Sequence, residues 1–170
     1  MAMSGQTDTA SSSAASGGLS DANIVALLDE ANMADSASGA YAVKKATNPQ
    51  VKAYAREMVK DHTAMMNQSH AMMTKMKASM DTTSGDAADL ANNGRDKLKE
   101  LTDKAAGKDW DKNYIESQVD THQKVLDKLN DASKNSTDST VTKALTKASA
   151  KVQEHLTKAQ NLKSTVTDKS

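Results

Sequence analysis

The sequence contains no cysteine, so it can form neither a disulfide nor a thiolate metal site. Phenylalanine is also absent, aromatic residues make up 2% of the chain, and there is a single proline beside seven glycines. A sheet protein would place β-branched and aromatic residues on its faces, so this composition favours helices over strands. The scarcity of proline and glycine leaves long stretches in which helices can run unbroken.

Charge and hydropathy argue against two classes of partner. Lys plus Arg and Asp plus Glu number 22 each, which makes the formal net charge zero, and the only arginines are Arg56 and Arg95. The basic stripe of a nucleic-acid-binding protein is therefore missing. No apolar run approaches the roughly 20 residues that span a bilayer, and the polar start does not resemble a signal peptide. We expect no nucleic acid partner and no transmembrane segment in this sequence.

The chain divides into two parts by composition. Residues 1–19 are rich in Ser, Ala, Gly and Thr, and are predicted to form a disordered tether. Residues 20–167 carry apolar side chains at spacings of three and four, which is the period of amphipathic helices. A chain of 170 residues can bury one core. The second part is therefore predicted to be one helical domain.

Four long amphipathic segments are predicted. The first runs from Ser20 to Thr47, and Pro49 then opens the second, which ends near residue 81. The third begins near Asp109, and the fourth follows a polar loop at 133–140. Residues 82–108 are less regular and suggest a shorter helix. The predicted fold class is all-α: an antiparallel four-helix bundle with a long, partly helical crossover between helices two and three.

Side chains that can bind metals interrupt the apolar stripe of every one of these helices. They are Asp35, His62, His122 and His155. Asp35 and His62 lie almost equally far from Pro49 along the chain, so in an antiparallel hairpin they reach the same level. His122 and His155 flank the 133–140 loop with an offset of about one helical turn.

An internal repeat supports the same bundle. Val59-Lys-Asp-His62 on the second helix is similar to Val152-Gln-Glu-His155 on the fourth, as in a duplicated, ferritin-like bundle. The chain resembles a bacterial ferritin-like family in Tyr114, in His122-Gln123 and in four motifs: Asn32-Met-Ala-Asp-Ser36, Asn48-Pro-Gln-Val-Lys-Ala-Tyr-Ala55, Met58-Val-Lys-Asp-His62 and Gln153-Glu-His-Leu156. That family is known as domain of unknown function 4142, and its members are often labelled predicted outer membrane proteins. The resemblance covers roughly residues 20–165 and implies a ferritin-like bundle, a periplasmic or cell-envelope location, and no settled biochemical activity.

The family pattern also implies site residues. It places an acidic residue at Asp35, an Asp-His pair at Asp61 and His62, a histidine at His122, and a Glu-His pair at Glu154 and His155. This sequence departs from the pattern at two positions. Asp35 stands where the family usually has Glu, and Thr121 stands where an acid usually precedes the third histidine.

Three imidazoles and one carboxylate suit a single divalent or transition-metal ion, such as zinc, copper, nickel or iron. A carboxylate-bridged di-iron centre would need Glu-x-x-His on two helices, and the sequence has none. Asp61 and Glu154 directly precede their histidines, so each points about 100° away and could complete the shell or orient an imidazole. The predicted metal residues are Asp35, His62, His122, His155, Asp61 and Glu154. The predicted function is metal handling or stress protection rather than catalysis.

Two alternatives stay open at this stage. The histidines and Asp35 could hydrogen-bond to one another in the polar core layer of a structural or interaction bundle that binds no metal. The second helix is also rich in methionine, whose thioethers favour Cu(I). However, methionine fills irregular cores as well, and a chain without phenylalanine needs such side chains. No motif for a catalytic nucleophile or a phosphate-binding loop is present.

Overall fold

The computed structural model of the chain describes residues 20–79 and 85–167. Within these ranges the chain folds into five helices and no strand. The helices are α1 (Asp21–Lys45), α2 (Pro49–Met76), α3 (Gly85–Asp103), α4 (Lys108–Asn135) and α5 (Ser139–Thr167). The all-helical class is therefore confirmed. The tether predicted at residues 1–19 lies outside the described residues.

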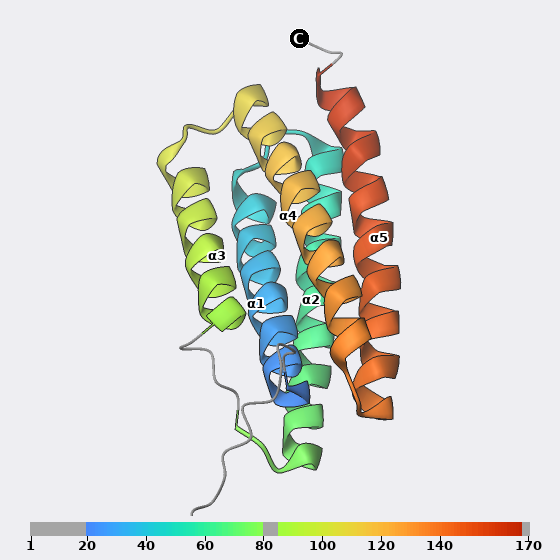
Figure 1. Cartoon of the computed structure of the whole chain (residues 1–170). Helices are drawn as coiled ribbons and strands as arrows, with labels where there is room; N and C mark the ends of the chain where they lie inside the picture. The colour runs from blue at the N-terminus through green and yellow to red at the C-terminus, as the bar shows by residue number, and fades with distance from the viewer. Residues whose placement is uncertain (1–19, 80–84, 168–170) are drawn as a thin grey trace, which may run out of the picture.

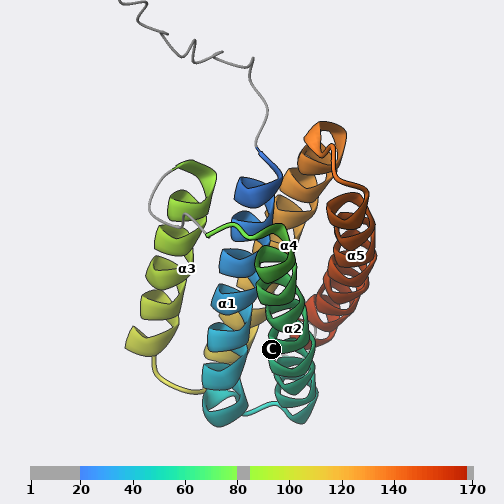
Figure 2. The ribbon, with the colours of Figure 1, turned by 90° about the horizontal axis from the view of Figure 1, so that it is seen from below.

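The helices form two antiparallel hairpins, α1 with α2 and α4 with α5, as Figure 1 shows. Because α2 and α4 run in the same direction, the connection between them must return the chain to the opposite end of the molecule. Helix α3 makes this return along the outer side of α1, away from α5 (Figure 2). The sequence predicted a long, partly helical crossover with a shorter helix here, and the structure has the helix α3 within that segment.

Small side chains explain why α3 can form beside α1. Ala87 and Ala91 are buried, and Leu101 joins the core at the far end of the helix. At Gly94 the backbones come so close that an added Cβ would lie 2.6 Å from the Cβ of Ala34. Alanine and glycine, which are weaker apolar signals than leucine, contribute to the packing of this segment, so its apolar stripe is less distinct in the sequence.

Polar side chains define the ends of the helices. Ser20 caps α1 by accepting a hydrogen bond from the backbone of Asn23, and Asn48 caps α2 just before Pro49. Asp111 fastens the turn between them from α4. Its carboxylate accepts bonds from the backbone N–H groups of Thr47, at 3.0 Å, and Asn48, at 2.7 Å, and from the Thr47 hydroxyl at 2.6 Å.

Helix α1 is buried on several sides, because α2, α3 and α4 all pack against it. The residues of α1 that recur at spacings of three and four are all buried: Ile24, Leu27, Leu28, Ala31, Asp35, Ser38 and Ala42. Val25, Asp29 and Asn32, outside that pattern, are buried as well. Within the described ranges, none of the helices combines the length and the apolar character that crossing a bilayer requires.

The interior consists of two apolar clusters separated by a polar layer. One cluster lies toward the turn between α4 and α5 and includes Ile24, Leu129 and Val141. The other lies toward the turn between α1 and α2 and includes Val51 and Trp110. Residues between these levels on α1, α2, α4 and α5 supply the polar layer, and they include every histidine that the sequence placed on an apolar stripe.

We expect Asp111→Ala to lower the free energy of unfolding by roughly 2–4 kcal/mol, because it leaves three donors at the α1–α2 turn without their charged acceptor. Urea denaturation measures this loss. Asp109→Ala is the matched control, since Asp109 lies in the same helical turn but is exposed. Equal losses in the two variants would contradict the assigned role of Asp111.

Candidate metal centre

Three histidines from three helices meet in the polar layer. His62 comes from α2, His122 from α4 and His155 from α5, and each is at most 1% exposed. Their ring centroids lie 5.0 to 5.5 Å apart. The helical period brings the rings together, because each histidine lies on the stripe of its helix that faces the axis of the bundle. We call these three residues the histidine triad.

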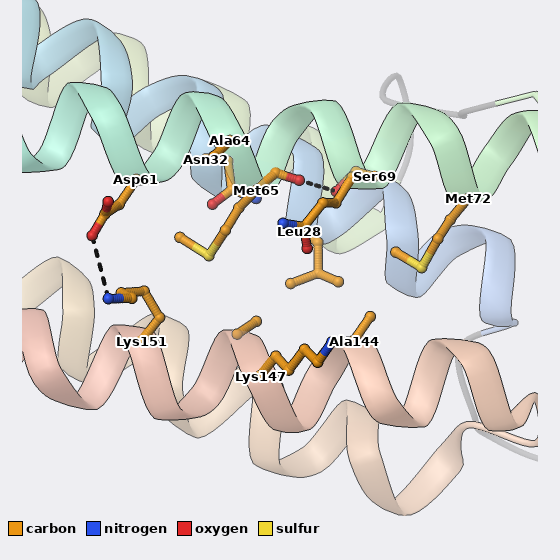
Figure 3. A pocket seen from close by; sticks show the side chains of 12 residues that line it. Leu28, Asn32, Asp61, Ala64, Met65, Ser69, Met72, Ala144, Lys147 and Lys151 are labelled. Carbon is orange, nitrogen blue, oxygen red and sulfur yellow. Dashed lines mark hydrogen bonds and ion pairs between the residues drawn. The ribbon is translucent and has the colours of Figure 1, made fainter.

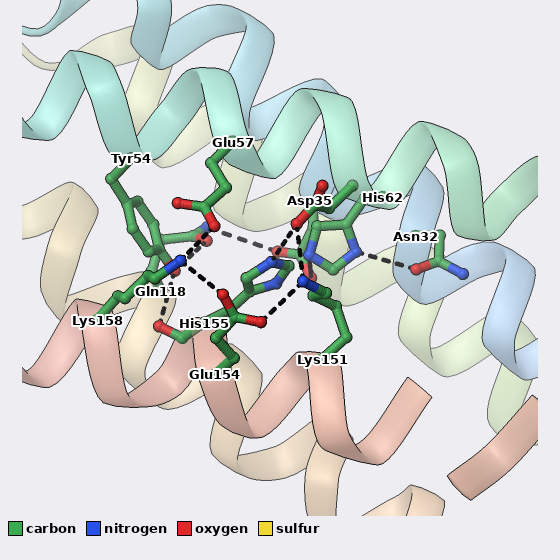
Figure 4. A network of polar contacts seen from close by, with 11 residues as sticks. Asn32, Asp35, Tyr54, Glu57, His62, Gln118, Lys151, Glu154, His155 and Lys158 are labelled. Carbon is green, nitrogen blue, oxygen red and sulfur yellow. Dashed lines mark hydrogen bonds and ion pairs between the residues drawn. The ribbon is translucent and has the colours of Figure 1, made fainter. Parts of the chain in front are cut away.

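One nitrogen of each imidazole is held by a hydrogen bond directed away from the triad. His62 Nδ1 is 2.9 Å from the Asn32 amide oxygen, His122 Nδ1 donates to the Gln118 carbonyl oxygen at 2.9 Å, and His155 Nε2 donates to Asp61 Oδ2 at 3.1 Å. All three partners are acceptors, so each of these nitrogens carries the proton of a neutral ring. Figure 4 shows the Asn32 contact of His62 beside His155.

The other nitrogen of each ring therefore carries a lone pair. His62 Nε2, His122 Nε2 and His155 Nδ1 are buried without a hydrogen-bond partner among the described residues. One ligand nitrogen from each ring lies within 4.8 Å of the other two. In a tetrahedral zinc centre the nitrogens are about 3.4 Å apart, so each would move less than about 1 Å toward a shared ion.

Asp35 lies at the edge of the triad. Its Oδ2 is 3.9 Å from His62 Nε2, which is the level match that the sequence predicted. Gln118 Nε2 lies 3.5 Å from Asp35 Oδ1 and also donates to Ser38 Oγ at 3.3 Å. Because Asp35 is 3% exposed, its carboxylate is costly to bury unless a proton or a cation neutralises it. A cation held by the triad would do so.

Burial keeps the imidazoles of His62 and His155 neutral. Desolvation lowers the pKa of His62 to about 4, although the nearby Asp35 carboxylate acts in the opposite direction. Desolvation also lowers the pKa of His155, against the opposing effect of its hydrogen bond to Asp61. A metal ligand must be neutral imidazole, so these two rings are in the binding form at neutral pH.

The two other acidic residues of the predicted set lie in different surroundings. Asp61 is partly buried between α2 and α5. Desolvation raises its pKa, but the His155 hydrogen bond and the charge of Lys151 outweigh that effect and leave the pKa below its usual value. Glu154 is exposed and lies between two lysines, with which it forms hydrogen bonds (Figure 4). Its bonds to Lys151 and Lys158 lower its pKa to about 2.

A second group of ligand atoms adjoins the triad. One ligand atom each from Glu57, Asp61 and His155 lies within 4.8 Å of the other two, and both carboxylates are partly exposed. We call these three residues the outer group. Its lysine partners come from α5: Lys158 Nζ is 2.5 Å from Glu57 Oε1, and Lys151 Nζ is 3.4 Å from Asp61 Oδ2. His155 belongs to both groups.

Two hollows border the polar layer. A cleft of about 210 Å³ lies between α2 and α5, where Asp61 and Lys151 face each other across it (Figure 3). Met65 and Met72 project into this cleft, and Asn32 also lines it. A second hollow of about 160 Å³, between α1, α3 and α4, reaches Asp35. The lysines that line the second hollow are Lys97, Lys124 and Lys128.

The sequence reasoning assigned no site role to Asn32, Gln118, Glu57 or the two lysines of α5. Glu57 stands one helical turn before Asp61, and Lys158 stands one turn after Glu154, so a search for neighbours on the same helix face would have found them. Asn32 and Gln118 gave weaker signals. A polar residue on an apolar stripe does not by itself show which imidazole it contacts.

We expect the ion-free protein to lose roughly 2–3 kcal/mol of stability between pH 7 and pH 4.5 through His62. Its folded-state pKa, about 4, lies below the ordinary 6.5, so on acidification the unfolded chain takes up the proton first. The contribution is full above pH 6.5 and declines as the pH falls toward 4, and His155 acts in the same direction. Urea titrations of chelator-treated protein at both pH values measure the loss. In a His62→Gln variant the loss should shrink, and an unchanged loss would contradict the assignment.

The comparisons with known proteins agree with the resemblance seen in the sequence. The family described as a domain of unknown function, DUF4142, matches residues 5–162. No curated protein and no solved structure matches the chain. Because the match spans most of the sequence and includes all six predicted metal residues, the chain belongs to the DUF4142 family.

Proposed function

We propose that this chain binds one transition-metal ion at the histidine triad, with Asp35 as the fourth ligand, and that it serves metal handling or stress protection. The ion is zinc, copper, nickel or iron, all of which accept imidazole ligands. The proposed location is the periplasm or the cell envelope, and it rests on the family resemblance. The proposed fold is ferritin-like, which the two antiparallel hairpins and the returning helix α3 support.

One observation carries the proposal: each of the three buried rings of the triad has one nitrogen with no hydrogen-bond partner among the described residues. A buried polar atom without a hydrogen bond costs about 1–3 kcal/mol, and native proteins keep few of them. Here three such nitrogens belong to rings whose centroids lie 5.0 to 5.5 Å apart, while the opposite nitrogen of each ring is bonded. This is the arrangement of metal-binding histidines, whose second nitrogen donates to an acceptor that fixes the orientation of the ring.

The alternative, a polar layer that only specifies the packing of the bundle, requires the histidines to bond to one another or to Asp35. The lone-pair geometry disfavours it. Three neutral rings whose protons all point outward cannot donate to one another, and the contact between His62 and Asp35, at 3.9 Å, is longer than a hydrogen bond. The outward hydrogen bonds therefore favour an ion over a self-contained network.

The methionines of α2, which could bind Cu(I), lie in two different surroundings. Met58 and Met73 are buried in the apolar clusters, so packing accounts for them. Met65 and Met72 border the cleft between α2 and α5, and a Cu(I) ion there would be held without the triad. The two proposals differ in which substitutions remove the ion.

We expect the parent protein to retain about one equivalent of a single ion after incubation with mixed metals, including Cu(I), and desalting. His62→Gln and His122→Gln should each lose it, because each removes one of three converging nitrogens. His70→Gln is the matched control. His70 also lies on α2, but its side chain is 52% exposed and paired with Asp29. Elemental analysis gives the stoichiometry, and a rise in melting temperature with added ion gives an independent measure.

Retention by His62→Gln and His122→Gln at the parental level would refute the triad as the site. Copper that persists in these two variants but disappears from a Met65→Leu, Met72→Leu double variant would transfer the function to the methionine cleft. If neither the parent nor the variants hold an ion, the structural alternative is the better description of the polar layer.

We expect His122→Leu to leave the ion-free protein as stable as the parent, or about 1 kcal/mol more stable. The substitution removes an unpartnered buried nitrogen and retains a side chain of similar volume. A substitution that removes a functional residue often makes the protein more stable, because such residues are retained for function rather than for stability. Denaturant unfolding after chelation measures the difference, and a loss of several kcal/mol would instead assign the imidazole a structural role.

A further inference from the structure

The triad is closed to solvent, so any ion that it binds needs a route through the bundle. Each of its imidazoles is at most 1% exposed. Among the described residues, one of the three rings has a second nitrogen that lies beside partly exposed carboxylates: His155, through its Nε2 contact with Asp61. The corresponding nitrogens of His62 and His122 face an amide oxygen and a helix carbonyl oxygen.

We infer that the outer group, Glu57, Asp61 and His155, is a loading site that first captures the divalent ion and passes it to the triad through His155. The inference rests on the proposed function. Its ligand atoms already lie within 4.8 Å of one another, and carboxylate oxygen with imidazole nitrogen is a donor set for divalent transition metals. The side chains of Asp61 and Glu57 are 18% and 31% exposed, so an ion can reach them from solvent.

The two nitrogens of His155 make the transfer chemically simple. An ion on Nε2 leaves the ring proton on Nδ1, which faces the lone pairs of the triad. An ion on Nδ1 leaves the proton on Nε2, where Asp61 accepts it, as the structure shows. The ring is neutral in both states and no proton is gained or lost overall. A neutral imidazole binds one ion at a time, so the loading site and the triad exclude each other and the final stoichiometry is one.

Two lysines hold the loading site in the absence of an ion. Lys158 Nζ contacts Glu57 at 2.5 Å and Glu154 at 2.7 Å, while Lys151 Nζ contacts Asp61 at 3.4 Å and Glu154 at 2.7 Å. An arriving cation competes with both ammonium groups. Glu154 lies beside both lysines on α5. It can remain paired with them when Glu57 and Asp61 turn to the ion. This arrangement assigns Glu154 to the lysines rather than to the metal.

The opposite side of the polar layer is less suited to a cation. The hollow between α1, α3 and α4 reaches Asp35, but its lining has three lysines, Lys97, Lys124 and Lys128, for that single carboxylate. The side between α2 and α5 sets Glu57, Asp61 and Glu154 against Lys151, Lys158 and Lys147, so its charges balance. Coulomb repulsion on the lysine-rich side therefore favours approach of a cation from the α2–α5 side.

Stopped-flow absorbance with Co²⁺, a coloured stand-in for zinc, tests the loading site in the full chain. We expect Glu57→Gln to slow loading by at least about tenfold, since it removes the most exposed carboxylate of the site, while about one equivalent still binds at equilibrium. Lys158→Met should accelerate loading several-fold, because it removes the ammonium that competes with the ion. Glu116→Gln is the matched control. Glu116 also pairs across helices with a lysine of α5, at 3.8 Å, but is not part of the outer group.

The opposite signs expected for Glu57→Gln and Lys158→Met separate loading from a structural role. If both variants slow loading alike, or if Glu57→Gln loads at the parental rate, the inference is wrong while the triad stands. It is also wrong if Glu57→Gln binds no ion at equilibrium, which would make Glu57 a permanent ligand. If the parent binds two equivalents of ion at equilibrium, the loading site is instead part of a two-ion centre. If the parent binds no ion from the metal panel, the proposed function fails and the loading site fails with it.

Discussion

The burial of three neutral imidazoles at one level of the bundle is the constraint on which the rest of the site depends. Each ring has one proton to donate, and in each the outward nitrogen donates it: to an amide oxygen, a helix carbonyl oxygen and a carboxylate. That choice leaves three lone pairs directed inward. Ring orientation and the fit to a cation follow from it, while burial lowers the pKa of His62 and His155.

The surrounding fold offsets the unfavourable free energy of burying this polar layer. Apolar clusters lie on both sides of it, and the Asp111 carboxylate fastens the α1–α2 turn from α4. Helix α3 adds burial where α1 would otherwise face solvent, with Gly94 allowing the close approach. A bundle with intact cores above and below one polar level can tolerate unpartnered atoms there, whereas the same atoms in a small core would prevent folding.

The charged residues around the layer divide into two roles. Asp35 and Asp61 contact imidazoles of the triad, whereas Glu154 pairs with Lys151 and Lys158. The sequence motif presents Asp61-His62 and Glu154-His155 as equivalent pairs, but the structure separates them. Asp61 bonds to His155, which is the histidine of the other pair, whereas Glu154 is exposed to solvent. Residues one apart on a helix diverge by about 100°, so the neighbouring helix decides which acid finds a partner.

Local sequence features determined much of this protein: periodicity predicted the helical class and the inward faces of Asp35, His62, His122 and His155, while Pro49 and the polar loop at 133–140 marked the breaks between helices. These follow from local spacing and composition, which a sequence displays directly. The tertiary structure decided that α3 is a full helix, that Asp61 serves His155 from another helix, and that Glu57 joins them. Each of those depends on rotation and depth between helices distant in sequence. A shift of one residue in the rotation or depth of a helix moves a side chain to another face. The spacing of residues along one helix does not show how that helix is rotated or shifted against its neighbours.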